Sequence, residues 1–267
     1  MGIRSKYTIK NYTIVDDIEF AYIEEKLPYI HVKMSGGVDS AMVMYTLAHL
    51  KQQQLIDKDT VFQAVTGVNW TRPYQEHFVN KTIDWINTQF EGDWEPIPPA
   101  MVDRIAKHET PEDGVNRLLD AEENNKKLKV YYTGASRFLP EDYTVGTEWE
   151  HRKIPKGTKF NKLDMTYRQY LNPELPENPY HHPDEISRLW KQPHRDEIYH
   201  RRISPWENKH KGHVKAVSDY FGVTDQVLDV TRSCEYLESQ DKQWMDWSEH
   251  CGECLWCAER VVTYNRY

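Results

Sequence analysis

One stretch of the sequence decides the fold, and it reads Tyr29-Ile30-His31-Val32-Lys33-Met34-Ser35-Gly36-Gly37-Val38-Asp39-Ser40. Its first half contains Tyr, Ile and Val, which favour an extended backbone, and two glycines then interrupt it. The residues that follow, Ala41–Gln53, are rich in helix formers and contain neither Gly nor Pro. A strand, a glycine turn and a helix in this order form the βα unit of a parallel sheet. We therefore predict an α/β fold.

The glycine turn, residues 35–40, has the composition of a phosphate-binding loop. Gly36 and Gly37 allow backbone N–H groups to approach phosphate oxygens closely, and the next helix directs its N-terminus at the anion. The two flanking serines add hydroxyl donors. Asp39 would repel a polyphosphate, so we expect it to hold Mg²⁺ or to organise the loop. No lysine follows the glycines, which argues against a Walker-type loop.

Composition and periodicity predict further elements on both sides of this unit. The predicted strands are Tyr7–Val15, Val61–Val68, Lys127–Tyr132 and Val227–Val230. The predicted helices are Asp16–Glu25, Tyr74–Gln89, Ala100–His108 and Trp206–Phe221, with Gly222 at the C-cap of the last. Thr133-Gly134-Ala135-Ser136 follows a predicted strand, so we expect it on the ligand side of the sheet.

These elements divide the chain into four segments. We expect an N-terminal arm in residues 1–28 and a nucleotide-binding core in residues 29–138. Residues 139–202 are rich in Pro, Tyr, His and charge without clean periodicity, which indicates an insertion that forms a substrate or lid region. Residues 203–267 contain a C-terminal helix and a cysteine-rich segment.

The cysteines are clustered near the end of the chain, which is typical of a metal site rather than of a disulfide framework. Cys251, Cys254 and Cys257 have CxxCxxC spacing, and Cys234 lies upstream. Four thiolates suit a closed, structural Zn²⁺ site. Iron–sulfur ligation uses the same residues and stays open as an alternative.

Charge and hydropathy narrow the class of protein. The formal net charge of −8 argues against a basic nucleic-acid surface, without excluding nucleic acid as a partner. No apolar run approaches the roughly 18 residues of a membrane span, and the N-terminus has no apolar signal-peptide region. We expect a cytoplasmic protein that does not enter a membrane.

Several motifs resemble known families. Residues 35–40 match the SGGxDS signature of the PP-loop, or N-type ATP pyrophosphatase, superfamily. Within it, the chain resembles 7-cyano-7-deazaguanine synthase in three C-terminal motifs: Ser204-Pro205-Trp206-Glu207-Asn208-Lys209-His210-Lys211, Thr231-Arg232-Ser233-Cys234 and the CGxCxxCxxR run from Cys251 to Arg260. The resemblance covers about residues 29–70 and 203–260; residues 139–200 have no counterpart, and the family's Tyr-Pro-Asp-Cys stretch is missing.

The resemblance implies an adenine nucleotide alpha-hydrolase-like, Rossmann-like parallel sheet with helices on both faces, plus a four-cysteine zinc segment. It implies an ATP-dependent ligase that adenylates a carboxylate or amide oxygen, releases pyrophosphate and joins ammonia to a deazapurine, as in queuosine precursor synthesis. ATP would bind residues 35–40, Asp39 with Mg²⁺ would hold pyrophosphate, and Lys211 would support the departing charge. Cys234, Cys251, Cys254 and Cys257 would bind Zn²⁺.

Two other functions remain open. A PP-loop sulfurtransferase or phosphosulfate reductase would keep the fold but would need a free catalytic cysteine or a bound cluster. A non-catalytic nucleotide-binding protein would use its large insertion as a partner surface. The sequence also leaves a homodimer open.

Overall fold

The centre of the molecule is a five-stranded sheet in the order β5-β4-β3-β6-β7, in which every pairing is parallel. The computed structural model describes residues 8–16, 18–68, 73–90, 92, 94–106, 109–125, 130–134, 136, 202–206, 209, 211–233, 250 and 255–265. The strands are β3 (Tyr29–Lys33), β4 (Val61–Val68), β5 (Met101–Arg104), β6 (Tyr131–Thr133) and β7 (Arg202–Ile203). The predicted α/β fold is confirmed.

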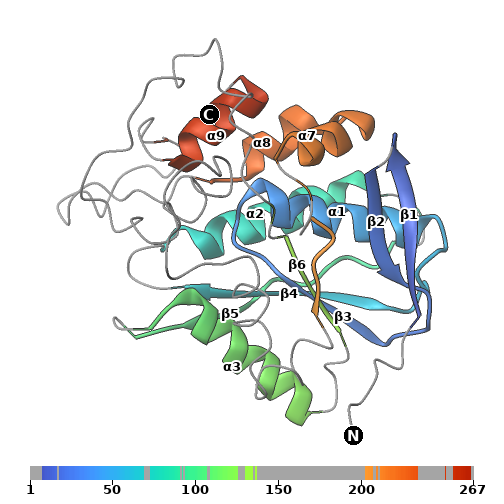
Figure 1. Cartoon of the computed structure of the whole chain (residues 1–267). Helices are drawn as coiled ribbons and strands as arrows, with labels where there is room; N and C mark the ends of the chain where they lie inside the picture. The colour runs from blue at the N-terminus through green and yellow to red at the C-terminus, as the bar shows by residue number, and fades with distance from the viewer. Residues whose placement is uncertain are drawn as a thin grey trace, which may run out of the picture.

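Helices cover both faces of this sheet (Figure 1). α1 (Val38–Gln52) and α2 (Gln75–Gln89) lie on one face, and α3 (Pro111–Asn124) packs on β4 and β5 from the other. α7 (Lys211–Tyr220), α8 (Thr224–Val230) and α9 (Leu255–Tyr264) form a further layer, in which α7 and α8 contact α1 and α9 contacts α7. Within the described ranges, no helix is long and apolar enough to cross a bilayer.

α1 is buried along almost its whole length, and its position explains why. It contacts β3 and β6 on one side, α2 at its flank, and α7 and α8 on the other side. Residues on opposite sides of the helix, such as Met42 and Met44, are therefore both fully buried. A helix that is apolar all round is typical of such a central position. The glycine loop at the start of α1 is thus attached to the most deeply buried helix that the structure describes.

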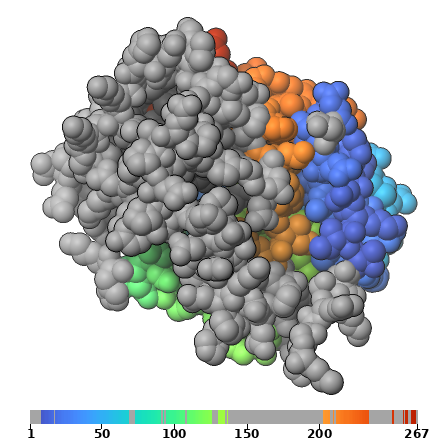
Figure 2. Space-filling model, in the orientation of Figure 1, coloured from blue at the N-terminus to red at the C-terminus, as the bar shows by residue number. Residues whose placement is uncertain are grey.

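The N-terminal arm forms a β-hairpin, so the helix predicted for Asp16–Glu25 is wrong. β1 (Ile9–Val15) pairs antiparallel with β2 (Ile18–Ile23). Ile18, Phe20 and Tyr22 are buried at every second position, which is the period of a strand. Packing of this face therefore decides the structure of the segment. The hairpin lies beside α7 (Figure 2).

Two more predicted elements differ from the structure. The helix predicted for Ala100–His108 is a strand, β5, and the helix starts only at Pro111, after a capping box between Thr110 and Asp113. The strand predicted for Val227–Val230 belongs to α8, where Val227, Leu228 and Val230 are buried. Valine favours strands locally, but burial of this helical face outweighs that preference.

The helix predicted for Trp206–Phe221 starts later than expected, at Lys211, and the third predicted strand is described as Tyr131–Thr133. β3, β4, α1 and α2 lie where the sequence places them. Gly222 follows α7 with a φ of 67°, the left-handed conformation expected at a helix C-cap. The insertion predicted for residues 139–202 lies outside the described residues except for Arg202 in β7.

The contact of β4 with α3 can be tested at Gly67. A Cβ atom built at this glycine would lie 2.0 Å from the carbonyl oxygen of Pro111, a backbone atom that cannot move unless α3 moves. We expect Gly67→Ala to lower the free energy of unfolding in urea by about 3 kcal/mol or more. Gly222→Ala is the control, because it adds backbone strain in open space and should cost only about 1 kcal/mol. Equal losses in the two variants would contradict the close packing.

Candidate functional site

The glycine loop lies at the switch point of the sheet. The chain passes from β3 to β4 on one side, while β6 pairs with β3 on the other, and ligands of open α/β sheets bind where the strand order reverses in this way. The loop follows β3, and Gly134 follows β6. A Cβ atom on Gly134 would lie 2.5 Å from the backbone nitrogen of Ser40, so only glycine allows the two strand ends to meet at α1.

The loop itself is held by short polar contacts. The Ser35 N–H donates to Ser40 Oγ over 3.2 Å, and Ser40 Oγ donates to the Gly37 carbonyl over 3.1 Å. Gly36 has a φ of 78°, and a Cβ atom there would lie 3.0 Å from Cβ of Phe78 on α2. Gly37 is the N-cap of α1, and no described side chain caps this helix. The first N–H groups of α1 are therefore suited to receive an anion.

Asp39, in the first turn of α1, is the centre of a polar cluster. Lys211 Nζ lies 2.7 Å from each of its carboxylate oxygens, and Ser136 Oγ donates to Oδ2 over 2.7 Å. The indole N–H of Trp206 donates to the Asp39 carbonyl over 3.1 Å. These partners come from α7, from the segment after β6 and from the segment before α7, so the fold brings distant parts of the chain to one carboxylate.

Lys211 also reaches a second carboxylate. Its Nζ lies 3.5 Å from Oε2 of Glu259 on α9, and both residues are buried. Burial alone would lower the pKa of Lys211, but the charges of Asp39 and Glu259 outweigh it and raise that pKa. Lys211 is therefore a cation at neutral pH. Burial, together with the same two carboxylates, raises the pKa of Tyr264, so its phenol stays protonated.

The predicted site residues are brought together where the structure describes them. Residues 35–40 form the loop, and Lys211, far away in sequence, contacts Asp39 directly. Their roles in binding and catalysis stay predictions. The sequence did not single out Trp206 or Glu259 as functional, because an indole and a glutamate next to longer motifs give no separate signal. Ser136 was expected only as part of a strand end facing ligand.

Of the four cysteines in the predicted zinc site, the structure describes only Cys257. Cys234, Cys251 and Cys254 lie outside the described residues. Cys257 is buried in α9, and its Sγ lies 3.8 Å from Nδ1 of His250. Among the residues that the structure does describe, no group of three or more His, Cys, Asp or Glu could hold a metal ion. The zinc site therefore stays a prediction.

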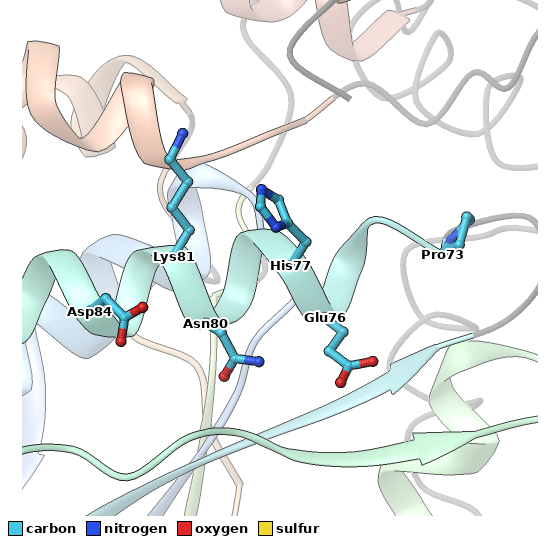
Figure 3. A pocket seen from close by; sticks show the side chains of 6 residues that line it. All are labelled: Pro73, Glu76, His77, Asn80, Lys81 and Asp84. Carbon is cyan, nitrogen blue, oxygen red and sulfur yellow. The ribbon is translucent and has the colours of Figure 1, made fainter. Parts of the chain in front are cut away.

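A cavity of about 570 Å³ lies along α2, away from Asp39. It is lined by Pro73, Glu76, His77, Asn80, Lys81 and Asp84. Figure 3 shows that Lys81 and His77 point to one side of the helix, whereas Glu76 and Asn80 point to the other. Lys81 already donates to the Asp229 carbonyl over 2.9 Å, and Glu76 pairs with Arg104. Since its polar groups do not converge, the cavity lacks the character of a ligand site.

Fold and site together define a parallel α/β domain with a glycine loop beside a buried lysine–carboxylate cluster. No family model and no curated protein matches the chain. Among solved structures, it is similar to the U34-tRNA thiolase NcsA from Methanococcus maripaludis, determined with its [4Fe-4S] cluster, at a TM-score of 0.41 and 14% identity. The match covers 79% of this chain and 60% of that one, so it spans less than two thirds of the thiolase.

The ion pairs of Lys211 can be tested by unfolding. Lys211→Met leaves Asp39 and Glu259 in a buried site without their cation, so we expect the free energy of unfolding to fall by about 3 kcal/mol or more. Because the pKa of Lys211 is raised from 10.5, its contribution is fully present below that value and is lost only as the pH rises through the higher, folded-state pKa. The loss measured in urea should therefore be equal at about pH 6 and about pH 9.

Lys215→Met is the matched control for this variant. Lys215 lies one turn further along α7 and forms an exposed ion pair with Asp219, which should contribute less than about 0.5 kcal/mol. If Lys211→Met cost no more than Lys215→Met, the buried cluster would not stabilise the fold.

Proposed function

We propose that the chain is an enzyme that binds ATP at residues 35–40 and cleaves it between the α- and β-phosphates to activate a substrate oxygen. One observation carries the proposal: Asp39 and the buried Lys211 meet at the N-terminus of α1, beside a glycine loop at the switch point of a parallel sheet. This arrangement supplies N–H donors, a carboxylate and a permanent cation within one small volume. Phosphoryl and nucleotidyl transfer depend on such positioned charges.

The residues present also fit Mg²⁺. A carboxylate offers about four lone-pair positions, and the Asp39 oxygens share three with Lys211 and Ser136, which leaves one on Oδ1. Mg²⁺ is usually bound by one or two carboxylates together with substrate phosphates and water. Asp39 would hold the ion, which when bound neutralises charge on the phosphate oxygens.

The remaining residues would hold and balance this carboxylate. Ser136 and Trp206 fix the side chain and the backbone of Asp39, so that it meets the phosphates in one orientation. Lys211 would stabilise the negative charge that develops on pyrophosphate as the bond to the α-phosphorus breaks. Glu259 keeps Lys211 in place from the other side.

For the substrate, we propose a carboxylated deazapurine, with ammonia as the nitrogen nucleophile. The support is the resemblance of residues 204–211, 231–234 and 251–260 to 7-cyano-7-deazaguanine synthase. The substrate oxygen would attack the α-phosphorus and displace pyrophosphate, and the nitrogen would then displace AMP together with that oxygen. This makes the protein an ATP-dependent ligase that forms a C–N bond.

Turnover of ATP is the first test. With Mg-ATP, ammonia and 7-carboxy-7-deazaguanine, the purified chain should release AMP and pyrophosphate and form a product that mass spectrometry detects. Asp39→Asn should lower kcat by about 100-fold or more, because it removes the charge that organises the phosphate site. Asp84→Asn, an exposed position on α2, is the matched control and should leave the rate unchanged.

The outcomes separate the competing functions. ATP binding without AMP release under any of these conditions would refute the enzyme and favour a nucleotide-binding interaction protein. If AMP were released but the deazapurine did not react, cleavage of ATP between the α- and β-phosphates would be supported, whereas the proposed substrate would be refuted.

Metal analysis is the second test. We expect about one zinc per chain, because four thiolates form a closed zinc site. Cys257→Ser should lose the zinc and lower the melting temperature, since a structural metal contributes directly to folding. A chelator added to the unmodified chain should have the same effect. Iron with acid-labile sulfide in place of zinc would contradict this expectation and favour the sulfur-transfer alternative.

A further inference from the structure

The segment Thr231–Ser233, which directly follows α8, lies against the glycine loop. The backbone N–H of Arg232 donates to the Gly36 carbonyl over 2.8 Å. A Cβ atom on Gly37 would lie 3.8 Å from both the Arg232 carbonyl oxygen and Ser233 Oγ. Loop and segment are therefore in direct contact along two consecutive residues on each side.

This segment is fixed from behind by hydrogen bonds. The Arg260 guanidinium on α9 donates to the Thr231 carbonyl over 3.2 Å and also to the Leu228 carbonyl. Thr231 Oγ1 donates to the Val227 carbonyl over 2.6 Å. Thr82 on α2 donates to the Val230 carbonyl over 3.2 Å. The backbone of Arg232 thus has a defined position relative to the loop.

The side chain of Arg232 is buried and stacks on an aromatic ring. Its exposed fraction is 7%, and its guanidinium carbon lies 5.2 Å from the centroid of Tyr74, which precedes α2. The next residue, Gln75, has its amide nitrogen 3.4 Å from the Ser35 carbonyl, so this end of α2 also borders the loop. Stacking uses the faces of a guanidinium, whereas its N–H donors lie in the plane and suit the bidentate geometry of phosphate.

A buried arginine beside a phosphate-binding loop can attract the negative charge of a bound phosphate. Lys211 contacts Asp39 on one side of the loop, and Arg232 contacts Gly36 on the other side. A polyphosphate bound across residues 36–37 would therefore have one cation on each side.

We propose that Arg232 contacts the β,γ-phosphate end of ATP bound at the glycine loop. This inference rests on the proposed function, since it assumes that the loop binds ATP. It assigns to the arginine of the Thr-Arg-Ser-Cys stretch a role in binding the leaving pyrophosphate, separate from the roles of Asp39 and Lys211.

Nucleotide binding can test the assignment without turnover. Calorimetry with the full chain, Mg²⁺ and either α,β-methylene ATP or AMP compares ligands with and without the β,γ-phosphates. Arg232→Met should weaken binding of the ATP analogue by about 10- to 100-fold, the loss expected for hydrogen bonds to a charged group. Binding of AMP should change less than about threefold. Arg232→Lys should be intermediate, because it keeps the charge but loses the planar fork.

Arg117→Met is the matched control, because it removes an arginine that pairs with Asp103 and Glu109 on the other face of the sheet. It should leave both affinities unchanged. Unchanged binding of the ATP analogue by folded Arg232→Met or Arg232→Lys would overturn the assignment, as would equal weakening of ATP analogue and AMP, which indicates a structural role. If the unmodified chain bound neither ligand, the proposed function itself would fail.

Discussion

Lys211 lies between two carboxylates in a site from which water is largely excluded, and the arrangement of three helices depends on this contact. Asp39 comes from α1, Lys211 from α7 and Glu259 from α9. Each of these charges would be costly to bury alone, and the cost falls only when all three are in place. The ion pairs therefore help to specify how α7 sits on α1 and how α9 sits on α7, whereas the apolar core around α1 supplies most of the favourable free energy of folding.

α9 connects the cysteine-rich end with the glycine loop. Within about one helical turn it carries Cys257, Glu259 and Arg260, and each of these contacts a different part of the structure. Cys257 faces His250, Glu259 reaches Lys211, and Arg260 holds the segment that hydrogen-bonds Gly36. A shift of α9 would consequently disturb both the cation beside Asp39 and the backbone beside Gly36. A metal bound near the start of α9 would stabilise the loop through these contacts.

The elements that were predicted correctly are those whose structure is determined by the local sequence pattern. The βα unit around residues 29–52 and helix α2 have strong, uninterrupted patterns, and both lie where they were predicted. Ile18–Ile23 and Val227–Val230 were assigned wrongly because their structure is decided by what they pack against. In the site, Asp39 and Lys211 belong to recognisable motifs, whereas the contacts of Ser136, Trp206 and Glu259 arise only from long-range folding.

The topology explains why this site needs the end of the chain. β3 and β6 alone bring Gly134 and Ser136 against α1, so the sheet places the loop and one partner of Asp39. Lys211, Arg232 and Arg260, the cations placed near the loop, all come from the C-terminal part of the chain, which packs on α1 and α2 from outside the sheet. A sheet with α1 alone would leave Asp39 beside an incoming polyphosphate without a counter-charge, and the two anions would repel each other. The packing of α7, α8 and α9 therefore completes the core and brings Lys211 to the carboxylate beside the loop.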